Sequence, residues 1–267
     1  MHKIESYNQI RTLVGQIRSL RKGFVTNFYW DDNKHNYWIE EGCFLYEVYK
    51  DCILLIHINQ SFNSLFFIST DFDSVTSALK TINMDSTQVI DIVCKGDGIA
   101  ERNFFKSIGF EDYRSLYRMS HIGQMAVSDT ILDSSVCYGS VEDSNIINEV
   151  FQQDFDPLCE QLPSLREIQD YANRKQLLII KEGEQLCGFL IFEMTGVTWY
   201  LRYWYTSPKY RNKGVGTKLI KSALVLGKET KRQLFWVISD NENAIKRYEH
   251  YGFRREDMND YVIIKRK

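Results

Sequence analysis

The sequence has no excess of charge of one sign, because 33 Lys and Arg residues nearly balance 35 Asp and Glu residues. A protein that binds nucleic acid through phosphates needs a clustered basic surface, and the most basic run here is residues 265–267. No apolar run reaches the length of a membrane span, and charges at Lys3, Glu5 and Arg11 interrupt any secretory leader. We therefore expect a cytosolic protein without a nucleic-acid or membrane partner.

The sequence also has no closely spaced cysteines. Its six cysteines stand at positions 43, 52, 94, 137, 159 and 187, with no C-x-x-C pair typical of a zinc knuckle or redox site. The five histidines are dispersed, without metal-ligand spacing. We expect no disulfide framework and no metal, and we predict that the cysteines act as small buried hydrophobic residues.

The apolar fraction of 44% can supply a core, and 267 residues leave room for two small domains. Apolar spacing predicts the same order of elements in both halves, with 121–134 as the linker. In the first half we predict helices at 4–20, 74–82 and 99–107, strands at 44–49, 53–58, 65–68 and 88–93, and a final pair of strands after Phe110. In the second half we predict helices at 143–155, 164–174, 219–226 and 241–251 and strands at 177–181, 186–194, 198–206, 234–239 and 261–265.

A glycine-rich turn lies between a predicted strand and a predicted helix of the second half. Residues 211–217 read R-x-x-G-x-G-T. Gly214 and Gly216 let the backbone approach a ligand closely, because neither carries a Cβ. The N–H groups that begin the helix then face an anion, and Lys213 adds positive charge. The pattern predicts a pyrophosphate cradle.

A short internal repeat supports the division into two domains. Residues 105–117 align with residues 248–261, with one extra residue in the second copy. Both copies end a helix at a glycine and enter a strand with Phe110 or Phe253, as a glycine C-cap requires.

Two ordered motifs carry a resemblance to a known family. The runs 205–216 (YTSPKYRNKGVG) and 241–253 (NENAIKRYEHYGF) resemble the GNAT N-acetyltransferase superfamily, and the likeness covers residues 135–267. It implies an α+β fold with two GNAT-like domains, each a mixed, mostly antiparallel twisted sheet flanked by helices. Residues 135–267 would be the catalytic domain, and the sheet would be splayed at the strand before the cradle.

The resemblance also implies roles for single residues. Tyr248 would act as general acid on the departing thiolate, since a phenol can donate a proton. Acetyl-CoA, the co-substrate, would contact the strand backbone, the cradle and the start of the last helix: Trp204, Tyr205, Thr206, Arg211, Asn212, Lys213, Gly214, Val215, Gly216, Thr217, Asn241 and Tyr248.

The base that deprotonates the amine stays open. Glu193 is one candidate and Asp240 another, and for each a solvated or salt-bridged carboxylate is the competing interpretation. The aromatic residues of 199–205 fit either an acceptor wall or a packing interface.

The first half departs from the family pattern. Phe105 stands where the second half has Tyr248, and residues 68–75 contain no glycine, so no cradle of the same kind can form. Asp71 and Asp73 are expected to cap the following helix. We predict that residues 1–120 form a degenerate GNAT-like domain that covers the open side of the catalytic half and shapes the acceptor pocket.

The leading hypothesis is an acetyl-CoA-dependent N-acetyltransferase that acts on a primary amine of a small molecule or peptide. The alternatives are a non-catalytic acyl-CoA-binding or sensing module, and a transferase that uses aminoacyl-tRNA. The near-neutral charge and the intact cradle argue against the last. The acceptor, the acyl chain length and the oligomeric state cannot be read from the residues.

Overall fold

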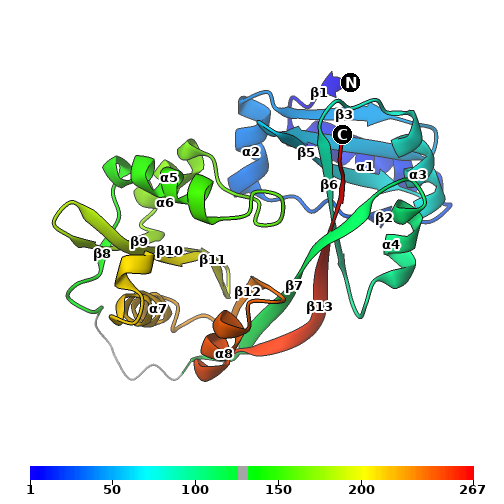
Figure 1. Ribbon diagram of the computed structural model, residues 1–267. Coiled ribbons are helices and arrows are strands. Elements are labelled where there is room, and N and C mark those ends of the chain that lie inside the picture. Colours follow the sequence, from blue (N-terminus) through cyan, green and yellow to red (C-terminus); the bar gives the residue numbers. More distant parts are fainter. Residues whose placement is uncertain (126–131) are drawn as a thin grey trace. The chain divides into compact units, whose positions relative to one another are not determined.

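The computed structural model describes residues 1–125 and 132–267. The chain forms two compact units (Figure 1): the first contains Met1–Leu116 and Asp257–Lys267, and the second contains Tyr117–Glu256. The units therefore differ from the predicted contiguous halves, because the last residues of the chain join the first unit. Part of the predicted linker 121–134 lies outside the described residues, and its start, His121–Ile122, belongs to a strand.

The strands of the first unit follow the order β1-β3-β4-β5-β6-β13. All pairs are antiparallel except β5 with β6. The bounds are β1 (His2–Lys3), α1 (Tyr7–Ser19), β2 (Val25–Thr26), α2 (Asp32–Glu40), β3 (Phe44–Val48), β4 (Cys52–Ile58), β5 (Phe62–Ser69), α3 (Phe72–Thr81), β6 (Thr87–Cys94), α4 (Ile99–Lys106), β7 (Glu111–Ile122) and β13 (Arg254–Lys265). β7 continues into the second unit, and β13 begins there.

The strands of the second unit follow the order β7-β12-β11-β10-β9-β8. β11 and β12 are parallel, whereas β8, β9, β10 and β11 pair antiparallel in sequence. The bounds are β8 (Cys137–Tyr138), η1 (Val141–Asp143), α5 (Ser144–Asp154), α6 (Leu165–Asn173), β9 (Leu177–Glu182), β10 (Gln185–Thr195), β11 (Thr198–Thr206), η2 (Pro208–Tyr210), α7 (Val215–Leu226), β12 (Arg232–Ile238) and α8 (Glu242–His250).

Each sheet buries side chains on both faces because side chains alternate along a strand. In β9, Leu178 and Ile180 join a core that includes residues of α7 and α8, whereas Leu177 and Ile179 join a core with residues of α5 and α6. The α+β class and the flanked mixed sheets are confirmed. The predicted capping box of α6 is present, since the Ser164 hydroxyl accepts from the Glu167 amide and the Glu167 carboxylate accepts from the Ser164 amide.

The internal repeat forms the same turn twice. The Phe110 amide donates to the Phe105 carbonyl, and the Phe253 amide donates to the Tyr248 carbonyl, both at 3.2 Å. The intervening Gly109 and Gly252 have φ of 93° and 90°, which only glycine adopts without strain. The two halves therefore share this turn in three dimensions as well as in sequence.

Three expectations were wrong. One long strand, β7, follows Phe110 in place of the predicted pair. The helix α2 was missed, since only His35 and Trp38 in it are buried and its periodicity is weak. Cys137 is exposed, although all six cysteines are free thiols.

Two further findings concern the described part of the chain. None of its helices combines the length and apolar character that a membrane crossing requires. Residues 1–125 and 132–267 contain no group of three or more His, Cys, Asp or Glu side chains that could hold a metal ion.

Candidate functional site

The second unit contains a fork between two parallel strands. β11 pairs with β12 only over Thr198–Tyr200, opposite Arg232–Leu234. Towards β10, in contrast, β11 stays paired along its whole length, up to Thr206 opposite Gly188. Residues 201–206 of β11 thus have a strand neighbour on one side only, within the described chain. We call residues 201–206 of β11 and 235–238 of β12 the second fork, because they lie in the second unit.

A β-bulge lies where the second fork opens. Ile191 pairs with Tyr203 and Phe192 pairs with Leu201, so Arg202 is an extra residue in β11. A bulge bends its strand and increases its twist, which turns β11 away from β12. The predicted base Glu193 holds this bulge: its carboxylate accepts from Arg202 Nε at 2.8 Å and from the Tyr171 hydroxyl at 2.7 Å. Glu193 is buried, with 4% of its surface exposed.

The predicted cradle follows the second fork directly. The short helix η2 is anchored by the Tyr210 hydroxyl, which lies 2.6 Å from Glu182 Oε2 and 2.9 Å from Gln185 Oε1. Asn212 and Gly214 then adopt left-handed φ values of 62° and 80°, which turn the chain into α7. Asparagine and glycine are the residues that tolerate this conformation best.

The start of α7 leaves backbone donors unused. Lys218 is the first helix residue whose N–H meets a carbonyl of the turn, that of Gly214 at 3.0 Å. The N–H groups of residues 214–217 have no hydrogen-bond acceptor in the described chain, and no side chain caps the helix. Four such donors at a helix N-terminus suit a phosphate anion.

The two glycines of the cradle have different functions. A Cβ on Gly214 would meet nothing within 4 Å, so this residue is needed for its positive φ. A Cβ on Gly216 would lie 2.9 Å from Thr206 Oγ1 and 3.2 Å from Trp204 Cζ2. Gly216 therefore allows the first turn of α7 to approach the end of β11.

Tyr248 on α8 faces the same core as the cradle helix. Its ring lies 4.0 Å from Phe235 and 5.5 Å from Trp204, and only 8% of its surface is exposed. Burial raises the pKa of Tyr248, Arg247 opposes this, and the charge of Glu160 adds to it. The phenol therefore keeps its proton at neutral pH and is a donor.

The Tyr248 hydroxyl also differs from the hydroxyls of four other tyrosines of this unit. It makes no hydrogen bond to any residue among 1–125 and 132–267. The hydroxyls of Tyr171, Tyr203, Tyr205 and Tyr210 all have protein partners. A hydroxyl that packing holds in place without an internal partner can interact with a ligand.

The remaining predicted residues lie at the ends of their strands. Asn241 is the N-cap of α8, and its Oδ1 accepts from the Ala244 amide at 3.1 Å, which leaves its two N–H donors for other contacts. Asp240 is exposed at the turn before it. Arg211 is exposed at the end of η2, and the Lys213 ammonium lies 5.0 Å from the centre of the Tyr210 ring.

The aromatic residues of β11 point to both faces of the sheet. Trp199 and Trp204 pack in the core that contains α7, and Tyr203 and Tyr205 in the core that contains α5. Packing within the second unit therefore accounts for most of this aromatic tract.

Sequence reasoning missed Glu160, in the connection between α5 and α6. The Tyr203 hydroxyl donates to the Glu160 carbonyl at 3.3 Å, and the Glu160 side chain accepts from the Asp156 amide at 2.7 Å. Its charge contributes to the raised pKa of both Tyr203 and Tyr248. No spacing pattern points to it, because it lies in a connection without periodicity.

Comparison with known proteins gives a family match for part of the second unit. Residues 145–253 match the model of the acetyltransferase (GNAT) family, and this range contains the second fork, the cradle and Tyr248. No curated protein matches the chain by sequence.

Solved structures share the fold over most of the chain. An acetyltransferase from the GNAT family of Colwellia psychrerythraea has a TM-score of 0.58 at 12% identity, covering 99% of this chain and 98% of that one. A GCN5-related N-acetyltransferase from Sphaerobacter thermophilus has a TM-score of 0.56 at 9% identity, with coverage of 91% and 95%. A tandem GNAT protein from the clavulanic acid biosynthesis pathway has a TM-score of 0.52 at 11% identity, with coverage of 81% and 79%. At such identities the likeness concerns the fold. The family match identifies an acetyltransferase (GNAT) family domain in residues 145–253.

Proposed function

We propose that the second unit transfers an acetyl group from acetyl-CoA to a primary amine of a small molecule or peptide. The observation that carries the proposal is the set of unused N–H donors at residues 214–217, at the end of a strand that has lost one neighbour. A helix N-terminus of this kind suits a pyrophosphate, and a one-sided strand suits an extended amide chain.

The proposed binding follows from these two features. The amides of residues 214–217 hold the pyrophosphate, and the side chains of Arg211 and Lys213 add positive charge. Backbone groups of residues 204–206 hold the pantetheine arm and orient the acetyl carbonyl. The free N–H donors of Asn241 contact the same arm.

The reaction is a direct displacement. The amine nitrogen forms a bond to the acetyl carbon, the bond from that carbon to sulfur breaks, and the amine loses a proton. Tyr248 donates its proton to the departing thiolate, which its raised pKa and unpartnered hydroxyl support. General acid catalysis of this type contributes roughly 10² to 10⁴ in rate.

Glu193 is better suited to a positioning role than to that of base. Its carboxylate binds the guanidinium of Arg202 through Nε and Nη2 and also accepts from the Tyr171 hydroxyl. Both oxygens of this carboxylate therefore already accept hydrogen bonds within the unit. We propose that Glu193 keeps the bulge at Arg202 in place and so keeps the second fork open. The proton of the acceptor amine passes to a base or to water.

Two measurements test the proposal. Acetyl-CoA titrated by calorimetry should bind saturably, and a panel of primary amines should include one that causes CoA release. Saturable binding with no amine-dependent release across small-molecule and peptide amines would support the non-catalytic binding module instead. No binding at all would contradict the assignment of the cradle.

A further inference from the structure

The first unit also contains a fork between parallel strands. β5 pairs with β6 only over Phe62–Ser64, opposite Thr87–Val89. Towards β4, β5 stays paired up to Ser69 opposite Cys52, without a register shift. Residues 65–69 and 90–94 are the first fork, and they correspond in order and direction to residues 201–206 and 235–238 of the second.

A segment of the chain itself occupies the first fork. The short strand β2 pairs with the free side of β5, Val25 opposite Ser69 and Thr26 opposite Ile68. The Thr26 hydroxyl donates to the Phe67 carbonyl at 2.6 Å. The backbone edge of β5 that does not pair with β6 therefore makes hydrogen bonds to β2 within the same unit.

Asn27 spans the first fork with its side-chain amide. Its Nδ2 donates to the carbonyl of Leu65 on β5 and to that of Asp91 on β6, both at 3.1 Å. Its Oδ1 accepts from the Phe67 amide at 2.7 Å. A carboxamide offers two N–H donors and an acceptor oxygen, and Asn27 uses all of these groups here. An amide of an extended ligand would need the same backbone partners.

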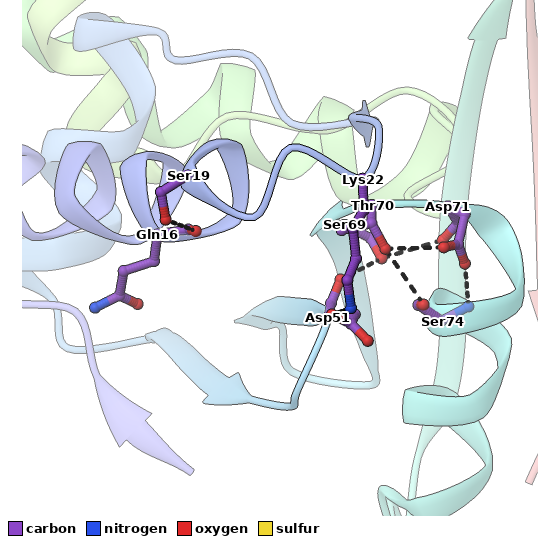
Figure 2. A network of polar contacts seen from close by, with 8 residues as sticks. All are labelled: Gln16, Ser19, Lys22, Asp51, Ser69, Thr70, Asp71 and Ser74. Atoms are coloured by element: carbon purple, nitrogen blue, oxygen red, sulfur yellow. Dashed lines mark hydrogen bonds and ion pairs between the residues drawn. The ribbon is translucent and has the colours of Figure 1, made fainter.

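The helix after the first fork is capped by its own anion. Only Thr70 and Asp71 separate β5 from α3, so no loop like residues 207–214 is present. The Asp71 carboxylate accepts from the Ser74 amide at 2.7 Å and from the Thr70 hydroxyl at 2.8 Å (Figure 2). The bond from the Ser74 amide holds the pKa of Asp71 below its usual range. A carboxylate thus takes the position at α3 that a phosphate would take at α7.

The occupying segment is fixed where it enters. Gly23 has φ of 120°, and a Cβ there would lie 2.7 Å from the Thr70 carbonyl oxygen, so only glycine fits. Lys22 Nζ lies 3.1 Å from Asp51 Oδ1, and the Asp51 carbonyl accepts from the Ser69 hydroxyl at 2.9 Å (Figure 2). Residues 22–27 therefore run past the start of α3 and into the first fork.

We propose that residues 22–27 are a built-in occupant of the first fork, that Asn27 and Asp71 stand where an acyl-CoA would place an amide and a phosphate, and that each chain therefore binds one acyl-CoA. The proposal goes beyond the function proposed for the second unit, since it assigns the first unit a closed, self-liganded fork. A ligand entering it would have to break the three bonds of Asn27 and the pairing of β2.

The first test counts sites. Calorimetric titration of the intact protein with acetyl-CoA should give one site per chain, and Gly216→Val should weaken that site roughly thirtyfold or more. A second site in the intact protein, or unchanged affinity in folded Gly216→Val, would overturn the proposal. If the intact protein binds no acetyl-CoA, the function proposed for the second unit fails. Hydrogen exchange of the Phe67 amide then still decides whether residues 22–27 fill the first fork.

The second test reports on the occupant directly. Hydrogen exchange of the Phe67 amide, followed by NMR, should be slow and unchanged by saturating acetyl-CoA. Asn27→Ala should accelerate it roughly tenfold, the value of one lost hydrogen bond. Asn63→Ala is the matched control, because Asn63 lies on the paired part of β5 and its Nδ2 donates to Ser86 Oγ.

Asn27→Asp provides a second variant in case Asn27→Ala does not fold. It keeps an acceptor for the Phe67 amide but loses both donors to Leu65 and Asp91. In this variant, hydrogen exchange of the Phe67 amide should stay slow, and exchange of the amides in β6 should become faster. Rapid exchange of Phe67 in the intact protein, or a change on adding acetyl-CoA, would show that the segment does not fill the first fork.

Discussion

The two forks of this protein have the same strand arrangement and different contents. In the first, β2 and Asn27 bond to the free edge of β5, and Asp71 caps α3. In the second, a bulge at Arg202 turns β11 away, and the amides that begin α7 have no acceptor in the described chain. The fold supplies a fork in either case. The residues placed in it decide whether a ligand has donors to bind.

The strongest expected effect concerns the hydroxyl of Tyr248, because the first unit has Phe105 at the corresponding position. Tyr248→Phe should lower kcat roughly 10²-fold or more, because the departing thiolate loses its proton donor, while acetyl-CoA affinity stays within about twofold. Steady-state kinetics and calorimetry measure the two quantities. Tyr46→Phe, which removes a hydroxyl from the first unit, is the control and should leave turnover unchanged. Equal kcat for Tyr248→Phe and the intact protein would remove Tyr248 from the mechanism.

The next effect concerns the cradle. Gly216→Val should weaken acetyl-CoA binding roughly thirtyfold or more, because its side chain meets Thr206 and Trp204 and displaces amides worth about 1.5 to 3 kcal/mol each to an anion. Gly15→Val is the matched control in the first unit, since a Cβ at Gly15 meets nothing within 4 Å. Circular dichroism should show both variants folded. Comparable binding losses in the two variants would mean that the cradle is not the anion site.

A smaller effect separates the two interpretations of Glu193. Glu193→Gln should lower kcat/KM about tenfold, because the bulge at Arg202 loosens, and the pH profile should keep its shape. A general base would instead take the acidic limb of the profile away with it, because activity rises with pH as a base loses its proton. Glu256→Gln is the control, since Glu256 binds Arg118 and Arg232 in the same unit, away from the bulge. A lost limb in Glu193→Gln alone would restore Glu193 as the base.

The smallest effect concerns acid stability, in which the units also differ. Burial lowers the pKa of His35 and of His57 in the first unit from 6.5 to about 3, with Lys34 adding to both effects and Asp31 opposing it at His35. The unfolded chain then binds protons that the folded unit does not, so stability falls as pH falls below 6.5. From pH 7 to 5.5 the loss should be about 1 kcal/mol for each histidine.

Hydrogen exchange at the two pH values measures this loss unit by unit. His57→Phe should remove about half of it, because a phenyl ring can keep the stacking on Trp38, 3.7 Å away, without titrating. His250→Gln, at an exposed position of α8, should leave it unchanged. A larger acid loss in the second unit than in the first would contradict the prediction.

Most helices and strands were predictable because their signals are local. The strand at 198–206 has the predicted bounds, and the capping box at Ser164 marks the start of α6. The short strands β1, β2 and β8 were not predicted, since two residues carry no periodicity and owe their conformation to a partner strand. The candidate site followed the same rule. The turn at 211–217 was predicted from its glycines, whereas the contacts of Glu193 and Glu160 were not.

The sequence by itself determined most of the longer elements, the glycine turn at 211–217 and the repeat that ends in Gly109 and Gly252, because each depends on residues close together in the chain. It also determined that the first half has no glycine cradle. Tertiary structure alone decided that residues 257–267 join the first unit and that Arg202 forms a bulge. It likewise decided that Asn27 lies between Leu65 and Asp91. These outcomes join residues far apart in sequence, and pairing between distant strands is fixed only when the whole sheet forms.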